Sequence, residues 1–186
     1  MSILVLNGLG EKDISYNIIS QKIIEGFDDE SDLEIINLRE KKIAPCQGCF
    51  GCWLKTPGIC VIDDEGREIA EKYINSDKVI FLTPVTFGGF SSTLKKVVDR
   101  LIPNVLPHFR KVNGEIHHKQ RYEKRSDLIG IGLLESAKSE DEGIFKEMLN
   151  RIAINMDVAY KCFFLCNSLS EKELDKAVQE IFQEVI

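Results

Sequence analysis

The residues Ile3-Leu4-Val5-Leu6-Asn7-Gly8-Leu9-Gly10 run from a short apolar stretch into a turn that contains two glycines. Apolar residues then recur at roughly helical spacing between positions 14 and 27. A strand covered on both faces is a continuous apolar run, whereas a helix packed beside it carries a single apolar stripe. The opening stretch therefore predicts a strand, a tight turn and a helix, in the order that builds parallel sheets.

The same unit recurs along the rest of the chain. Apolar runs predict strands at 3–6, 33–38, 79–82, 128–134 and 158–166, and apolar stripes predict helices over 14–27, 69–74, 94–102, 145–153 and 174–185. Asp63-Asp64 offers an N-cap and Ser170-x-x-Glu173 a capping box. This alternation predicts an α/β three-layer sandwich. Its five-stranded parallel sheet has the order 2-1-3-4-5, with helices on both faces.

Length and composition place further limits on the protein. The 186 residues fit a single domain over 1–186, and 44% of them are hydrophobic, enough for a sizeable core. The formal net charge of -6 opposes nucleic acid, so we expect none as a partner. No apolar run approaches the roughly 18 residues of a membrane span, so we expect no membrane partner. Residues 1–7 lack the basic start of a signal peptide, which predicts a cytoplasmic location.

The cysteine-rich loop at 39–62 is the strongest chemical signal. Four of the chain's six cysteines, Cys46, Cys49, Cys52 and Cys60, follow the spacing C-x2-C-x2-C-x7-C. Two-residue gaps let thiolates converge on one centre, as in iron–sulfur sites. Zinc also accepts such pairs, and four inert thiols are the third interpretation. By contrast, Cys162 and Cys166 lie on a predicted strand and are expected to be core residues.

Two further loops follow predicted strands, at the edge where ligands of parallel sheets bind. The first, residues 7–17, could hold a phosphate on its backbone amides, or could be a plain turn whose acidic residues complement the helix dipole. The second, residues 83–92, carries two glycines and two aromatic residues. It could form the floor for a flat ring, or could be a turn before a Ser N-cap. Trp53 could stack on a cofactor or anchor its own loop.

A basic insertion at 103–125 interrupts the alternation. Within it, residues 107–125 hold six basic against two acidic residues, a net charge of +4 in an acidic chain. Three uses compete for this charge: a subunit interface, an attraction for the phosphates of NAD(P)H, and a solvated loop. We favour the interface, because arginine and aromatic residues are enriched at interfaces. The acidic run at 140–142 is the expected partner.

Together these features resemble the flavodoxin-like NAD(P)H-dependent FMN reductases, in particular their iron–sulfur flavoprotein branch. The resemblance covers nearly the whole chain. It rests on Asn7-Gly8, on the cysteine loop followed by Asp63-Asp64, and on Pro84-Val85-Thr86-Phe87-Gly88 leading into Leu94-Lys95 and Asp99-Arg100. It implies a bound FMN, NAD(P)H as electron donor, an unidentified acceptor, and a homodimer or homotetramer. In the iron–sulfur branch, the compact cysteine motif binds a 4Fe-4S cluster close to the flavin.

The resemblance also assigns roles by position. Gly8, Leu9, Gly10 and Ser15 would surround the FMN phosphate; Pro84, Val85, Thr86, Phe87 and Gly88 would contact the isoalloxazine ring; Leu134, Glu135 and Ser136 would form a third wall. The first loop departs from the family pattern, since Leu9-Gly10-Glu11 stands where Ser-Pro-Arg is usual, which predicts weaker FMN binding. The sequence thus indicates an FMN-dependent oxidoreductase. A flavin-free regulatory module and a zinc-stabilised interaction domain are the alternatives.

Overall fold

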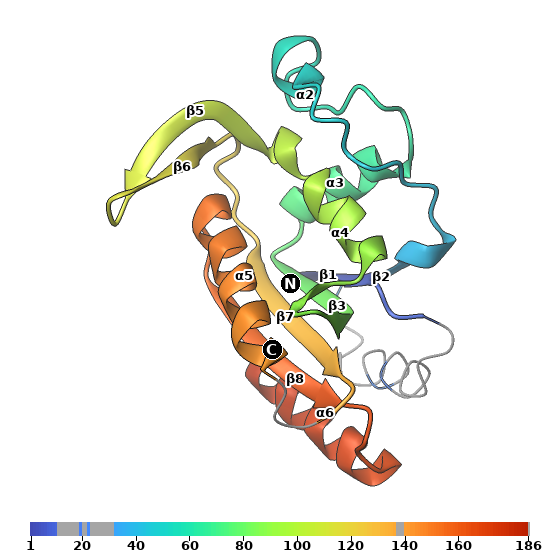
Figure 1. Ribbon diagram of the computed structural model, residues 1–186. Coiled ribbons are helices and arrows are strands. Elements are labelled where there is room, and N and C mark those ends of the chain that lie inside the picture. The colour runs from blue at the N-terminus through green and yellow to red at the C-terminus, as the bar shows by residue number, and fades with distance from the viewer. Residues whose placement is uncertain (11–18, 20–21, 23–31, 137–139, 186) are drawn as a thin grey trace.

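Five parallel strands form the central sheet of the computed structural model, which describes residues 1–10, 19, 22, 32–136 and 140–185 (Figure 1). The strands lie in the order β2-β1-β3-β7-β8. Their bounds are β1 Ser2–Asn7, β2 Asp32–Asn37, β3 Lys78–Thr86, β7 Asp127–Leu134 and β8 Tyr160–Cys166. The predicted order 2-1-3-4-5 is confirmed. The helix predicted over 14–27 falls outside the described residues, apart from Ile19 and Lys22.

Helices cover both faces of the sheet, as predicted. They are α3 Glu65–Asn75, α4 Ser92–Asp99, α5 Asp141–Met156 and α6 Glu171–Val185. Alternate residues of a strand point to opposite faces, so Leu4 and Leu6 join the core under α3, α4 and α5. Ile3 and Val5 join the core under α6. Among the described residues, no helix is long and apolar enough to cross a membrane.

Side chains close the helix ends where the sequence predicts. The Asp64 carboxylate accepts from the Gly66 amide at 3.0 Å, and the Ser91 hydroxyl accepts from the Leu94 amide at 3.3 Å. At α6, the Ser170 amide donates to the Glu173 carboxylate at 2.9 Å, and the Glu173 amide donates back to the Ser170 hydroxyl at 3.4 Å. Both predicted caps and the capping box are therefore present.

Strand β3 runs farther than its sequence predicts. The predicted strand stops at residue 82, yet β3 continues through Thr83-Pro84 to Thr86 and then folds back as the short antiparallel strand β4, Gly89–Phe90. The Leu82 carbonyl accepts from the Gly8 amide, so the backbone polar groups of Leu82 point toward β1. Pro84 is two residues further along β3, so its backbone points to the same side. Strand β1 has already ended there. The missing amide of Pro84 therefore breaks no ladder hydrogen bond.

The basic insertion is a β-hairpin rather than the loop that its composition predicts. After the 3-10 turn η2 (Ile102–Asn104), strands β5 (Val105–Val112) and β6 (Glu115–Gln120) pair antiparallel. Asn113 and Gly114 join them with φ of 48° and 89°. Positive φ at both central residues is what a two-residue type I′ hairpin requires, and Asn-Gly is its preferred sequence. The Asn-Gly dipeptide is the local signal for this hairpin, which the charge of the insertion does not reveal.

Candidate functional site

The first two amides of the loop after β1 form hydrogen bonds within the protein. The Gly8 amide donates to the Leu82 carbonyl at 2.7 Å, and the Leu9 amide donates to the Asn7 side chain at 3.0 Å. The Leu9 side chain is buried in the core. A Cβ on Gly8 would lie 2.9 Å from the Ser91 hydroxyl oxygen, so this glycine lets the loop pack against α4. Gly8 and Leu9 therefore present no free amide to a phosphate, and Ser15 lies outside the described residues.

A positive charge reaches this loop from the next strand. Arg39, in the 3-10 turn η1 (Leu38–Glu40) after β2, donates from its guanidinium to the Leu9 carbonyl at 3.3 Å. The buried Asn7 side chain joins the same edge to β2 by donating to Asn37 at 3.1 Å. Sequence reasoning missed Arg39, because only the sheet order brings residue 39 beside residue 9.

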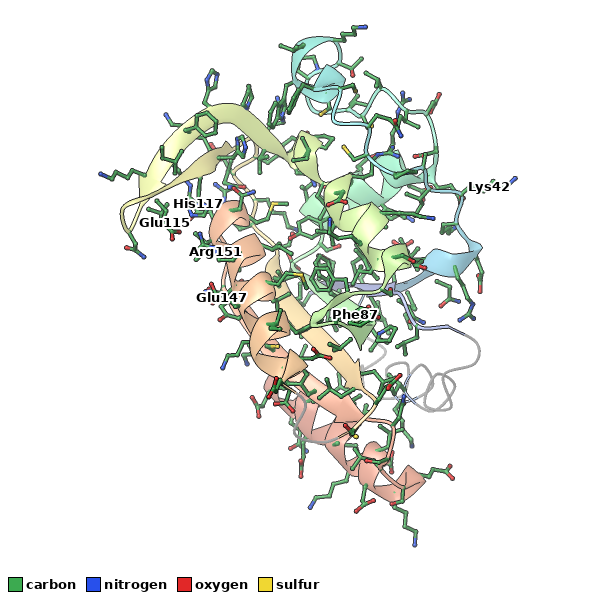
Figure 2. All side chains as sticks on the ribbon, viewed as in Figure 1. Lys42, Phe87, Glu115, His117, Glu147 and Arg151 are labelled. Atoms are coloured by element: carbon green, nitrogen blue, oxygen red, sulfur yellow. The ribbon has the colours of Figure 1, made fainter. Side chains whose placement is uncertain are left out.

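The turn between β3 and β4 exposes an aromatic ring at the carboxyl edge of the sheet. Phe87 is 94% exposed and, with Gly88, occupies positive φ, at 50° and 71° (Figure 2). A Cβ on Gly88 would lie 2.6 Å from Ile144, which brings α5 against the turn. A side chain other than glycine at positive φ is strained, and an exposed ring leaves its apolar surface in water. Phe87 and Gly88 are the two central residues of the turn that joins Thr86 to Gly89, and such a turn requires positive φ at both. The turn thereby holds the Phe87 ring out where it could contact a ligand.

The remaining predicted ring contacts divide into buried and exposed residues. Pro84 and Val85 are partly buried in β3, and Thr86 is exposed at its end. Leu134 is buried at the end of β7, whereas Glu135 and Ser136 are exposed just beyond it. The Ser91 hydroxyl caps α4, so the turn before a Ser N-cap is also present. The two interpretations of this loop are compatible, because the cap positions the turn and leaves Phe87 exposed.

The four clustered cysteines share one segment, residues 44–64, which contains the short helix α2 (Gly51–Leu54). Cys46 and Cys49 are exposed, Cys60 is partly buried and Cys52 is buried. Burial raises the pKa of the Cys52 thiol, and the neighbouring Cys60, Cys46 and Cys49 raise it further. The Gly48 amide donates to the Cys46 sulfur at 3.5 Å. Four thiols near one another, with an amide directed at one of them, have the donor chemistry that an iron–sulfur cluster needs.

The cysteines are not drawn together around a point. Within the described part of the chain, no group of three His, Cys, Asp or Glu side chains is arranged to hold a metal ion. Cys162 and Cys166 lie apart from this segment on β8, partly buried and buried respectively, as core residues should. The donor set therefore fits a cluster in its chemistry, and the loop would have to tighten to bind one.

A buried arginine closes the base of the cysteine segment. Arg100, at the end of α4, is 2% exposed. Its guanidinium donates to both oxygens of Asp64, at 2.8 and 3.0 Å. It also donates to the carbonyls of Ala44 at 2.8 Å and Ile62 at 3.3 Å. One side chain thereby holds the start and the end of the segment together.

The same carboxylate completes the closure. Asp64 accepts from the Ala44 amide at 2.9 Å and also caps α3. Burial raises its pKa, but hydrogen bonds from Arg100 and the Ala44 amide outweigh burial and leave the pKa lowered. Asp64 is therefore ionised at neutral pH. Its contribution to stability is present above the ordinary carboxyl pKa and is lost as the pH falls through the lowered one.

Aromatic rings connect the cysteine segment to the hairpin. Phe50 stacks on Trp53 with ring centroids 5.3 Å apart, Trp53 lies 5.0 Å from His118, and His118 lies 4.9 Å from Phe109. The Trp53 indole donates to the Val105 carbonyl at 2.9 Å. Of the two interpretations of Trp53, the structure supports the anchor, because its polar atom and its ring are both engaged by the hairpin.

Part of the hairpin's positive charge pairs with groups of the same chain. Arg110 donates to the Ile154 carbonyl at 2.8 Å and pairs with Asp157 at 2.9 Å, at the carboxyl end of α5. Cations there complement the helix dipole. The hairpin base is further fixed where Gln120 donates to the Asn155 carbonyl at 2.6 Å. This use of the charge was not among the three that the sequence suggested.

The cysteine segment lies far from Phe87 within one chain. It leaves the sheet after β2, but α2 lies at the top of Figure 1, beside the hairpin, and away from the carboxyl ends of β7 and β8. Figure 2 labels Phe87 near the end of β3, well below α2. Within a single chain the cysteine segment therefore does not lie beside the turn that carries Phe87, because residues 41–50 lead away from the sheet.

These features define a flavodoxin-like α/β protein with an exposed aromatic turn and a separate cysteine segment. The sequence model of the NADPH-dependent FMN reductase family matches residues 1–119, and the chain belongs to this family. It is 32% identical over 104 residues to an iron–sulfur flavoprotein of Methanocaldococcus jannaschii, an alignment that covers 55% of this chain and 53% of the relative. The chain thus spans about half the length of that relative.

Solved structures of low sequence identity share the fold. A Streptococcus mutans protein superposes with a TM-score of 0.73 at 14% identity, covering 99% of this chain and 98% of the other. An FMN-dependent NADH-azoreductase of Bacillus anthracis, solved with FMN, superposes with a TM-score of 0.65 at 14% identity, covering 100% and 97%. These likenesses confirm the predicted flavodoxin-like architecture.

Replacing Arg100 should open the base of the cysteine segment. We expect Arg100→Met to lower the free energy of unfolding by about 3 kcal/mol, because it leaves the Asp64 carboxylate without its buried partner. Urea denaturation measures the loss. Lys95→Met, which removes an exposed pair with Asp99, should cost about 0.5 kcal/mol or less. Equal losses in the two variants would show that Arg100 does not hold the segment.

Proposed function

We propose that the protein is an FMN-dependent oxidoreductase that takes electrons from NAD(P)H and passes them to an acceptor. Membership of the FMN reductase family supports this, and the observation that carries it is the strained, 94% exposed Phe87 at the carboxyl edge of β3. When bound, FMN accepts a hydride and can release the electrons singly. A cytoplasmic location suits the six free cysteines, since thiols stay reduced there.

The residues of the chain have distinct tasks in this proposal. Phe87 and Thr86 support the isoalloxazine ring, and the exposed Glu135 and Ser136 line the neighbouring strand end. Gly8 and Leu9 shape the first loop, and their amides donate to the Leu82 carbonyl and to the Asn7 side chain. Arg39, beside the Leu9 carbonyl, supplies positive charge near the phosphate end. No acid or base of the protein is needed, because hydride transfer to a flavin requires none.

The ring-binding role of Phe87 can be separated from its effect on folding. Phe87→Asn places Asn-Gly in the β3–β4 turn, the sequence that type I′ turns prefer. We expect the free energy of unfolding to rise by about 0.5–1 kcal/mol as strain is relieved, and FMN affinity to fall about tenfold as the stacking surface is lost. Thermal unfolding of the flavin-free protein and FMN fluorescence titration measure the two effects.

A second aromatic variant is the matched control for this experiment. Phe87→Tyr keeps a stacking ring on the same backbone and should retain wild-type FMN affinity. If Phe87→Asn binds FMN as tightly as wild type, the ring-binding role is wrong. If the wild-type protein binds no FMN at all, the flavin-free module becomes the better interpretation. The Gly8 and Leu9 amides, which donate to groups of the protein and not to a phosphate, would agree with that outcome.

We further propose that Cys46, Cys49, Cys52 and Cys60 hold a 4Fe-4S cluster. The four thiols share one segment, where Cys60, Cys46 and Cys49 act electrostatically on Cys52, and relatives named iron–sulfur flavoproteins support the choice of iron over zinc. When bound, such a cluster carries single electrons. Arg100 and Trp53 would hold the segment in place from its base and from the hairpin.

Serine variants test the cluster. After anaerobic purification, we expect broad absorption near 400 nm in the wild type and its loss in Cys46→Ser, Cys49→Ser, Cys52→Ser and Cys60→Ser. Cys162→Ser is the control and should keep the absorption, since this residue lies on β8. Iron and zinc analysis of the same samples decides the metal. A colourless wild type that contains zinc would establish the zinc-stabilised domain instead.

We also propose that the chain assembles as a homodimer or homotetramer through the hairpin. Phe109 is 61% exposed and Ile116 is 72% exposed on β5 and β6, and exposed apolar groups beside arginines are typical of interfaces. Assembly would bring one chain's cysteine segment toward another chain's Phe87. The basic side chains of the hairpin would pair with the acidic residues at 140–142 of a second copy of the chain.

Light scattering tests the hairpin interface. Ile116→Asp should lower the mass of the assembly, because a charge replaces an exposed apolar side chain of β6. Ile116→Val is the matched control and should keep the wild-type mass. An unchanged mass for Ile116→Asp would show that the hairpin is not part of the interface and that its remaining charged side chains face solvent.

A further inference from the structure

The buried guanidinium of Arg100 has one N–H group that the fold does not use. A guanidinium carries five N–H donors. In Arg100, the four on the Nη atoms donate to both oxygens of Asp64 and to the carbonyls of Ala44 and Ile62. The fifth, on Nε, is buried and has no hydrogen-bond partner within the described structure. A buried donor without an acceptor is costly, which indicates that an acceptor joins it in the working protein.

The Cys60 side chain is close enough to interact with this guanidinium. Burial lowers the pKa of Arg100, but its interactions with Asp64 and with Cys60 outweigh burial and raise the pKa. The backbone of Cys60 is held separately, because its carbonyl accepts from the Arg67 Nε at 2.7 Å. Cys60 is itself partly buried. One of the four clustered cysteines is therefore fixed beside a buried positive charge.

The ion pair of Arg100 with Asp64 has a fixed orientation. Besides Arg100, the two carboxylate oxygens accept from the amides of Ala44 at 2.9 Å and Gly66 at 3.0 Å. An added Cβ on Gly66 would lie 3.2 Å from an Nη atom of Arg100 and 3.0 Å from the Asp64 carboxylate, so glycine here lets the pair pack against the start of α3. The negative end of the pair therefore lies on the cap of α3, and the positive end interacts with Cys60.

We propose that Arg100 is a positioning residue for the 4Fe-4S cluster, in which its Nε–H donates to the Cys60 sulfur and favours the reduced state. This inference rests on the cluster assignment of the proposed function. Hydrogen bonds to the sulfurs and nearby charges both set the reduction potential of such clusters. A cation beside one ligand stabilises the reduced state, because the added electron brings one more negative charge. Arg100 should therefore raise the reduction potential.

Electrons and protons balance without a further reactant. One electron, which NAD(P)H supplies through the flavin in the proposed function, reduces the cluster by one unit of charge. No bond of the protein forms or breaks, and the Nε proton stays on Arg100, whose raised pKa keeps it protonated. Arg100 thus changes the equilibrium of the electron transfer and is not consumed by it.

The reduction potential of the anaerobically purified protein, measured by dye-mediated titration, tests this role. We expect Arg100→Gln to lower the equilibrium constant for reduction of the cluster about tenfold, which for a one-electron couple is a fall of about 59 mV. Asp64→Asn opens the same closure but removes a negative charge, so it should not lower the potential. A similar fall in both variants would show that Arg100 acts only on the shape of the segment, and would overturn the proposal.

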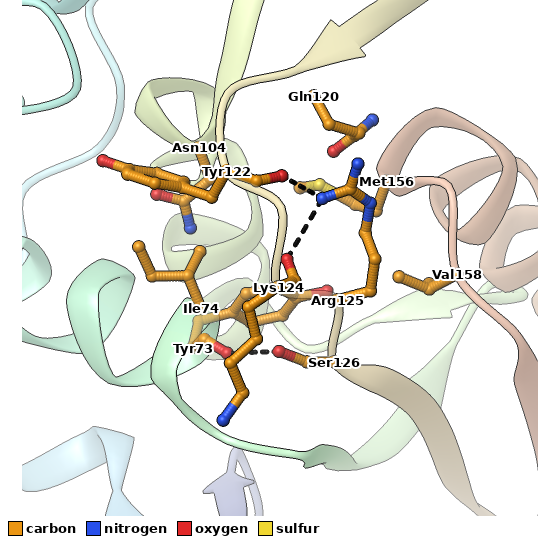
Figure 3. A pocket seen from close by; sticks show the side chains of 10 residues that line it. All are labelled: Tyr73, Ile74, Asn104, Gln120, Tyr122, Lys124, Arg125, Ser126, Met156 and Val158. Atoms are coloured by element: carbon orange, nitrogen blue, oxygen red, sulfur yellow. Dashed lines mark hydrogen bonds between the residues drawn. The ribbon is translucent and has the colours of Figure 1, made fainter.

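Arg125 offers a matched control. This exposed arginine lines a small cavity, where it donates to the carbonyls of Tyr122 and Lys124 (Figure 3). Arg125→Gln removes the same charge from a position where solvent and salt screen it, so the potential should stay at the wild-type value. Equal falls in Arg125→Gln and Arg100→Gln would show an effect of net charge alone and would overturn the proposal.

A measurement on the wild-type protein keeps the test independent of how the variants fold. With ¹⁵N in its arginine side chains, the reduced wild-type protein should show a weak ¹⁵N coupling to the cluster in pulsed EPR. Arg67→Lys, which replaces the arginine that contacts the Cys60 carbonyl, should keep this coupling. Absence of the coupling in the wild type, or its loss in Arg67→Lys, would overturn the proposal.

The outcomes distinguish this inference from the proposed function. Wild-type protein that contains no iron after anaerobic purification would overturn the cluster and this inference together. Wild-type protein with a cluster whose potential is the same in Arg100→Gln would overturn this inference alone, and the cluster assignment would stand.

Discussion

The buried ion pair between Arg100 and Asp64 fixes the cysteine segment to the rest of the fold. It joins the end of α4 to the cap of α3, and it fixes Ala44 and Ile62 at the two ends of the cysteine segment. An uncompensated charge in such a place is strongly destabilising, so each partner requires the other. The segment between the two ends can therefore be exposed and rich in cysteine without loosening the fold beneath it.

Because of this closure, the molecule has two chemically different ends. One is the carboxyl edge of the parallel sheet, where strained turns present Phe87. The other is built by the cysteine segment and the hairpin, joined by Trp53 and His118. Parallel sheets commonly bind ligands at the first kind of edge, whereas the second depends on insertions that the sheet does not require. An oligomer of the kind proposed above would bring these two ends of neighbouring chains together.

Local strain is tolerated at both ends where chemistry is proposed. Phe50 and Phe87 both have positive φ, at 53° and 50°, and both are exposed by more than half. Folding alone would favour glycine or asparagine at such positions and would not leave apolar rings in water. In the core, by contrast, strands alternate regularly and helices carry ordinary caps. The departures from local preference are therefore concentrated at the proposed sites.

The sequence by itself determined the parallel sheet, its order, the helix caps and the candidate cysteine and ring-binding loops, because these follow from apolar periodicity and from short motifs. The Asn113-Gly114 turn was also present in the sequence, and could have predicted the hairpin. Only the tertiary structure decided that Arg100 holds the ends of the cysteine segment together, that Arg39 reaches the first loop, and that Tyr122 packs against Gly58. Each of these contacts joins residues at least 30 positions apart. Local pattern carries no information on such pairs, since they form only when the sheet order and the loop paths bring their elements together.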